Sequence, residues 1–139
     1  RRSSDLFRSI MHPVFAVFTV LYCAGIFWLS SQPVGIQSSI PHIDKVVHMA
    51  LYAGLAGVIS IGIRRRKRPV SPATQVLVPV IAAVVYGVSD EIHQLFVPER
   101  TFDLVDIAAD GVGAVLAQYG LCRWFWRISW RRIGPGGHL

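Results

Sequence analysis

Four long apolar stretches separated by short polar segments dominate the pattern of this chain. They cover residues 13–29, 46–63, 69–89 and 104–121. A helix of about 20 residues is long enough to cross a hydrocarbon core of about 30 Å. The first and third stretches contain no charged residue, the second contains only His48, and the fourth contains Asp106 and Asp110. The pattern therefore predicts four transmembrane helices.

The connections between these stretches are too short to hold a soluble domain. The longest covers residues 30–43, and its Pro33, Gly35 and Pro41 favour turns over helix. We expect an all-α integral membrane protein whose residues 1–122 form a compact antiparallel four-helix bundle. Small residues spaced four apart predict close helix contacts on the second and fourth spans: Ala50 and Gly54, Ala53 and Gly57, and Ala109, Gly113 and Ala117.

Composition and charge agree with a membrane protein and orient it. Hydrophobic residues make up 53% of the chain and charged residues 16%, against about 25% charged in an ordinary soluble domain. Twelve of the fourteen Lys and Arg precede the first span, lie between the second and third, or follow the fourth. Because basic residues near the ends of short spans stay on the cytoplasmic side, we expect both termini to be cytoplasmic.

The net charge of +6 does not indicate a nucleic-acid partner. The basic residues flank apolar spans, which is the pattern that anionic inner-leaflet lipids favour, so we expect membrane lipids as partners and no nucleic acid. In the basic aromatic tail, residues 123–139, Arg123, Arg127 and Arg131 share one helical face with aromatic residues between them. This tail is predicted to include an interfacial amphipathic segment.

Seven of the eight acidic residues lie toward the opposite, outer membrane face, near the ends of the last three spans. Residues three or four apart share one face of a helix, so three polar stripes are expected to meet there. On the second helix the stripe is Asp44, His48 and Tyr52. On the third it is Tyr86, Asp90 and Gln94, flanked by Glu91 and His93. On the fourth it is Asp103, Asp106, Asp110 and Gly113.

Depth in the membrane makes some of these residues costly. At about 1.5 Å per residue, Asp110 lies about 10 Å below Asp103, where an acid costs several kcal/mol unless it is paired, protonated or turned inward. Such residues are functional candidates, although an inward polar network can also hold a bundle together. For two residues a simpler role is the alternative. Asp103 would cap the fourth helix, and Lys45 would pair with Asp44 or with a lipid phosphate.

At these residues the chain resembles the VanZ-like family. The similar segments are Ser30-Ser31-Gln32-Pro33, Asp44-Lys45-Val46-Val47-His48 with Tyr52, and the stretch from Tyr86 to Arg100 followed by Asp103, Asp106 and Gly113. The resemblance implies a small multi-pass protein of the bacterial inner membrane, and the named member of the family is linked to teicoplanin-type glycopeptide resistance. The family usually has glycine where this chain has Glu99, and asparagine where it has Asp110.

The leading hypothesis is a site on the periplasmic or extracellular side for the headgroup of a lipid or isoprenoid-linked cell-envelope intermediate, which the protein binds or modifies. The candidate catalytic residues are His48, His93, Asp90, Glu91, Asp106 and Asp110. The candidate substrate-binding residues are Lys45, Arg100, Asp44, Gln94, Tyr52 and Tyr86. The negative outer face opposes anion binding unless a cation offsets it, so a divalent cation is a candidate cofactor. Its candidate ligands are His48, Asp90, His93 and Asp106.

Two other functions fit the same sequence, and the residues leave open whether the chain is an enzyme. It is a candidate noncatalytic subunit of a larger membrane complex, with small and aromatic residues facing partner membrane subunits. Alternatively, Asp110 and Asp106, with His48, form part of a proton or cation pathway. The inner half weakens this alternative, because its spans offer Gln75, Gln118 and few other polar groups.

Overall fold

A computed structural model describes residues 11–32, 43–66 and 70–132, without the side chains of residues 125–132. Within these residues the chain forms four helices and no strand: α2 (Pro13–Ser30), α3 (Ile43–Arg64), α4 (Pro72–Gln94) and α5 (Leu104–Arg132). All four are long and apolar enough to cross a membrane. The predicted all-α fold with four transmembrane helices is therefore confirmed, whereas the cytoplasmic location of the termini stays a prediction.

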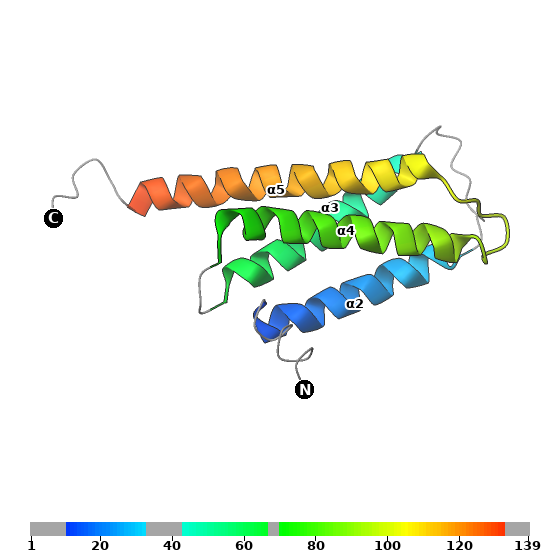
Figure 1. Cartoon of the computed structure of the whole chain (residues 1–139), viewed down its shortest axis with the longest axis horizontal. Helices are drawn as coiled ribbons and strands as arrows, with labels where there is room; N and C mark the ends of the chain where they lie inside the picture. Colours follow the sequence, from blue (N-terminus) through cyan, green and yellow to red (C-terminus); the bar gives the residue numbers. More distant parts are fainter. Residues whose placement is uncertain (1–10, 33–42, 67–69, 133–139) are drawn as a thin grey trace.

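The four helices lie side by side and run in alternating directions (Figure 1). Helix α3 contacts each of the other three, and α5 extends beyond the rest of the bundle toward the C-terminus (Figure 1). The starts of α3 and α5 therefore lie at the same end of the bundle as the ends of α2 and α4. The connection between α2 and α3, predicted to be rich in turns, falls mostly outside the described residues.

The helix bounds differ from the predicted spans in a consistent way. Helix α4 continues five residues beyond Ser89 to Gln94, and α3 begins three residues before Val46. Helix α5 does not end at Leu121 but continues to Arg132. Hydropathy marks only the part of a helix that contacts lipid, whereas backbone hydrogen bonding continues into polar residues. The polar residues at the outer ends of α3 and α4 are consequently held on regular helix.

The start of α4 is set by a cap rather than by hydropathy. The hydroxyl Oγ of Ser71 accepts a hydrogen bond from the backbone N–H of Thr74 at 3.1 Å, and Pro72 occupies the first helical position. Both features are typical of helix N-termini. The predicted start at Pro69 lies outside the described residues. The proposed division of the chain at residue 122 stays a prediction.

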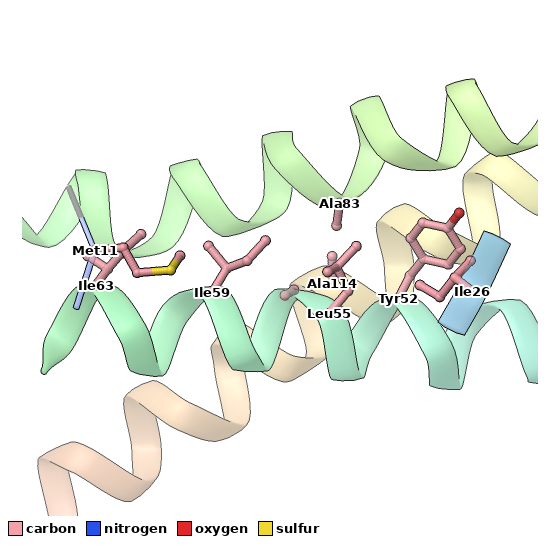
Figure 2. Close-up of a cluster of buried hydrophobic side chains, with 9 residues drawn as sticks. Met11, Ile26, Tyr52, Leu55, Ile59, Ile63, Ala83 and Ala114 are labelled. Carbon is pink, nitrogen blue, oxygen red and sulfur yellow. The ribbon is translucent and has the colours of Figure 1, made fainter. Parts of the chain in front are cut away.

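An apolar core runs along the middle of the bundle between α3, α4 and α5 (Figure 2). Most of its members come from α3: Tyr52, Leu55, Ala56, Ile59 and Ile63. Ile26 comes from α2, Ala83 from α4 and Ala114 from α5, and Met11 precedes α2. Toward the inner end, Ser60 Oγ donates to Gln118 Oε1 at 2.8 Å. The apolar core thus separates this inner polar pair from the acidic residues at the outer end.

Small residues let α3 and α5 approach closely at one of the predicted positions. A Cβ atom on Gly113 of α5 would collide with the backbone carbonyl oxygen of Met49 on α3. Gly54 instead faces the side chain of Tyr22 on α2, and a Cβ on Gly57 would meet nothing. The expected close contact therefore holds at Gly113 and Gly54 but not at Gly57, and Ala50 is exposed.

The turn between α4 and α5 carries an unusual backbone conformation. Glu99 has a φ angle of 65°, in the left-handed region that costs an L-residue roughly 1–2 kcal/mol. Glycine has no such penalty, which gives a physical reason for the glycine that the VanZ-like pattern usually has at this position. Glu99 is also exposed, so its side chain gains little from packing.

Replacing Gly113 with alanine should destabilise the protein by about 1–3 kcal/mol, because the added methyl group overpacks the contact with Met49. The matched control is Gly120→Ala on the same helix, where a Cβ meets nothing within 4 Å. Unfolding of both variants in detergent would be followed by circular dichroism. Equal stability of the two variants would contradict the close α3–α5 contact.

Replacing Glu99 with glycine should raise the free energy of unfolding by about 1 kcal/mol, because it removes the cost of the left-handed backbone. Glu99→Ala removes the same charge but keeps a Cβ atom, so it should give no such gain. The same unfolding assay distinguishes them. A gain shared by both variants would assign the effect to charge and not to backbone conformation.

Candidate functional site

The outer end of the bundle, where α3 and α5 begin and α4 ends, holds a group of ionisable side chains. Lys45 and His48 come from α3, and Glu91 comes from the last turn of α4. Asp103 precedes α5, and Asp106 and Asp110 lie on its first two turns. We call these six residues the polar cluster: Lys45, His48, Glu91, Asp103, Asp106 and Asp110.

Lys45 is surrounded by carboxylates. Its ammonium Nζ lies 2.9 Å from Asp44 Oδ2, 2.6 Å from Asp103 Oδ2 and 2.7 Å from Asp106 Oδ1. Two of these partners belong to the start of α5, so Lys45 connects α3 to α5. Nζ donates hydrogen bonds to Asp44 and Asp103 and forms an ion pair with Asp106. Three carboxylates thus offset its positive charge, which disfavours Lys45 as a ligand for a lipid phosphate.

Asp103 fulfils the predicted capping role and the ion pair together. Its Oδ1 accepts from the backbone N–H of Val105 at 2.8 Å, at the start of α5, and its Oδ2 accepts from Lys45. The hydrogen bond from Lys45, and then that from Val105, lower the pKa of the Asp103 carboxyl below its usual value. Asp103 therefore stays ionised and keeps both contacts over the physiological range.

His48 bridges two acids of α5. Its Nδ1 lies 3.1 Å from Asp110 Oδ1, and its Nε2 lies 4.0 Å from Asp106 Oδ2. Asp110 is fully buried, and a Cβ on Gly87 of α4 would collide with its carboxylate. The missing side chain of Gly87 thus provides the space in which Asp110 sits between α3, α4 and α5.

Glu91 is also fully buried, and its two oxygens differ. Oε2 accepts a hydrogen bond from the backbone N–H of Asp103 at 2.8 Å. Oε1 has no hydrogen-bond partner among the residues that the structure describes. One ligand atom each of Glu91, His48 and Asp106 lie within 4.8 Å of one another, and all three residues are buried. A histidine nitrogen and two carboxylate oxygens are donors that divalent metals accept.

Other predicted site residues join α4 to α2 instead. Asp90 Oδ1 accepts from Ser30 Oγ at 2.5 Å. His93 lies against Ser31, with Nε2 3.0 Å from its Oγ, and its ring centroid is 4.3 Å from that of Phe27. Tyr86 donates from its hydroxyl to the backbone carbonyl oxygen of Cys23 at 2.7 Å. His93 and Tyr86 therefore act in helix packing, outside the polar cluster.

A cavity of about 510 Å³ opens beside the polar cluster, between α2, α3 and the end of α4. One wall is apolar and is formed by Ile26, Leu29, Ile43, Val47 and Leu51. Six polar residues of the lining were predicted as site residues: Asp44, His48, Tyr52, Asp90, Gln94 and Arg100. Ser30 and Gln32 also line the cavity but were not predicted as site residues. The cavity therefore has the mixed lining that is typical of sites for amphiphilic ligands.

Arg100 differs from Lys45 in having no carboxylate partner. It lines the cavity and forms no ion pair within the described part of the chain. Its Nε is buried and makes no hydrogen bond to a described residue. A guanidinium group presents donors in a fork that matches carboxylate and phosphate geometry. Of the two predicted anion-binding residues, Arg100 is therefore the one whose charge no carboxylate of the described residues offsets.

The candidate metal ligands are distributed differently from the prediction. His48 and Asp106 lie together, but their nearby third donor is Glu91 in place of Asp90 and His93. Adjacent positions on a helix point about 100° apart, so the sequence alone could not decide whether Asp90 or Glu91 faces α5. Ser30 and Gln32 belong to a segment that resembles the VanZ-like family, but they were not predicted as site residues. The apolar wall of the cavity was also missed, because single apolar residues within a span carry no distinguishing pattern.

Comparison with known proteins agrees with the observed architecture. The sequence model of the family described as VanZ/LLP1 matches residues 4–126. No curated protein and no solved structure matches the chain. The matched segment includes the four spans, the polar cluster and the residues that line the cavity. This multi-pass membrane protein therefore belongs to the VanZ/LLP1 family.

Proposed function

We propose that the protein binds the headgroup of a lipid or isoprenoid-linked cell-envelope intermediate in the cavity between α2, α3 and α4. The observation that carries the proposal is the cavity itself, in which an apolar wall leads to an arginine without an anionic partner. The polar site would face the periplasmic or extracellular side of the bacterial inner membrane, as the distribution of basic residues predicts.

Access from the bilayer supports a lipid ligand. Leu29, Ile43 and Val47 line the cavity and are 37–48% exposed. The apolar rim is thus continuous with the surface that contacts acyl chains in a membrane. A lipid can leave its chains in the bilayer and extend only its headgroup into the cavity, which has the size of a small-ligand pocket.

Charge selects the chemistry of the headgroup. Arg100 can hold a phosphate through two parallel N–H donors, whereas Lys45 is occupied by three carboxylates. Asp90, which also lines the cavity, accepts a hydrogen bond from Ser30 and so keeps a fixed position. A phosphate bound at Arg100 would lie beside carboxylates that can accept hydrogen bonds from sugar or glycerol hydroxyl groups.

His48 is the candidate general base or acid for any reaction at the bound headgroup. Its ring lines the cavity, and its Nδ1 is held by Asp110. A carboxylate that fixes an imidazole ring in this way is a recurrent feature of acid–base catalysis. Sequestering or modifying an envelope intermediate would also alter susceptibility to glycopeptide antibiotics, in keeping with the role of the named family member.

The relay function has less support than headgroup binding. Between the polar cluster and the Ser60–Gln118 pair, α3 and α5 contribute the apolar side chains Leu55 and Ala114 to the core (Figure 2). Protons need a chain of polar groups or water to move between two sites, and these residues supply none. No contact in the described bundle specifically favours the function of a noncatalytic subunit.

Arg100→Gln should weaken binding of a polyprenyl phosphate at least tenfold, because it removes a charged hydrogen-bond donor worth roughly 1.5–3 kcal/mol. The purified chain in nanodiscs would be titrated with fluorescent polyprenyl phosphate and, separately, with phosphatidic acid and the uncharged polyprenol. The control is Arg123→Gln, an exposed basic residue far along α5. Equal binding by wild type and Arg100→Gln, or equal affinity for phosphate and polyprenol, would refute the proposal.

The cavity rim offers a second, paired test in the same assay. Val47→Trp should block the cavity and lower the affinity, because Val47 lines it. Val46→Trp places the same bulk on the neighbouring residue, which is 57% exposed and does not line the cavity, so its affinity should match that of wild type. Loss of binding in both variants would point to a general effect of the tryptophan on the bundle.

A further inference from the structure

We propose that His48, Glu91 and Asp106 form a binding site for one divalent transition-metal ion, of the class of Zn²⁺ or Mn²⁺, with Asp110 supporting His48 from behind. The site goes beyond the proposed lipid binding and does not depend on it. With an ion bound at Nε2 and Asp110 at Nδ1, His48 would be a metal ligand and not the general base or acid of a reaction at the headgroup. It brings together one residue from each of α3, α4 and α5, so an ion bound there would join the three helices at their outer ends.

The spacing of the donors fits a single ion. Ligand atoms about 2.0–2.2 Å from a metal lie roughly 3 to 4 Å apart, depending on the angle between them. His48 Nε2 and Asp106 Oδ2 are 4.0 Å apart, and all three donors lie within 4.8 Å of one another. Small rotations of buried side chains would bring them to coordination distance without moving the helices.

The orientation of His48 supports the same conclusion. Its Nδ1 is engaged by Asp110 Oδ1 at 3.1 Å, which directs Nε2 toward Asp106. Metal-binding histidines commonly donate their second ring N–H to a carboxylate, which fixes the tautomer and strengthens the ligand nitrogen. Asp110, fully buried behind the ring, would provide this support.

Glu91 supplies an independent sign of a missing partner. Its side chain is fully buried, its Oε2 is held by the N–H of Asp103, and its Oε1 has no hydrogen-bond partner among the described residues. A buried carboxylate oxygen without a donor or cation is costly. Because Glu91 belongs to the three-residue group, an ion between His48 and Asp106 would provide the missing interaction.

Charge balance and donor type define the class of ion. Of the buried acids Glu91, Asp106 and Asp110, only Asp106 pairs with Lys45 among the described residues. That contact is through Oδ1, which leaves Oδ2 for the metal. A divalent ion would offset the excess negative charge. The imidazole nitrogen favours Zn²⁺ over Mg²⁺ and Ca²⁺, which prefer oxygen ligands, and the two carboxylates also suit Mn²⁺. Three protein ligands also leave a coordination position for water or another ligand.

The test uses the full, tag-free chain in detergent without added lipid, stripped with a chelator and then titrated with Zn²⁺ and Mn²⁺ by calorimetry. We expect one ion per chain after dialysis, measured by elemental analysis, and a midpoint of thermal unfolding that rises with free metal. Glu91→Gln and Asp106→Asn should each lower the affinity at least tenfold. Asp110→Asn should lower it by about 10- to 100-fold, the usual effect of losing an outer-shell carboxylate.

Glu99→Gln is the control, because it removes an exposed acid from the nearby turn and should leave affinity unchanged. Co²⁺ loaded in place of Zn²⁺ should give visible absorption bands that change in His48→Gln. Less than one ion per chain in wild type, or wild-type affinity in well-folded Glu91→Gln and Asp106→Asn, would overturn the site. If these variants fail to fold, wild-type stoichiometry and the Co²⁺ spectrum decide. The lipid proposal would stand in either case, since no lipid enters the measurement.

Discussion

The outer end of this bundle depends on the pairing of charges that cannot be left alone in an apolar environment. Lys45 lies within 2.9 Å of three carboxylates, two of them from the start of α5. Asp106 is the buried member of the group, so leaving its carboxylate without a cationic partner costs more than breaking the partly exposed pairs with Asp44 and Asp103. The pairing therefore fixes how α3 and α5 begin relative to each other, and Gly113 lets the same two helices come close one turn below Asp110.

The use of Lys45 within the bundle divides the site into two parts. One part is internal: His48, Glu91 and Asp106 face one another between three helices and have the donor set of a metal site. The other part is the cavity beside them, where Arg100 has no anionic partner among the described residues and part of the lining is apolar. His48 belongs to both parts, so a ligand in the cavity would lie next to the proposed metal site.

Hydropathy was enough to predict the class, the four spans and the helix faces, because a period of 3.6 residues fixes which polar residues align. It was not enough to predict contacts between helices. The sequence suggested Asp44 or a lipid phosphate as the partner of Lys45, but two of its three partners are 58 and 61 residues away.

The direction in which individual side chains point was also not predictable. The sequence placed His93 in the site, whereas packing against Phe27 turns His93 toward α2. Asp90 was predicted as a metal ligand beside His48 and Asp106, but the carboxylate that lies beside them is that of Glu91. The cavity arises from the packing of three helices and has no signature in any one of them.

Lys45 holds α3 and α5 together through its ion pairs, whereas Arg100 is proposed to bind the ligand. The most direct measurement compares the free energy of unfolding of Lys45→Met and Arg100→Met in detergent. Lys45→Met should cost about 1.5–3 kcal/mol, because the buried carboxylate of Asp106 loses its cationic partner while Asp44 and Asp103 are partly exposed. Arg100→Met should cost less than about 1 kcal/mol. Asp106→Asn should reduce the cost of Lys45→Met when the two are combined. If Lys45→Met and Arg100→Met lowered the free energy of unfolding equally, and Lys45→Met showed no coupling to Asp106→Asn, Lys45 would not hold α3 and α5 together.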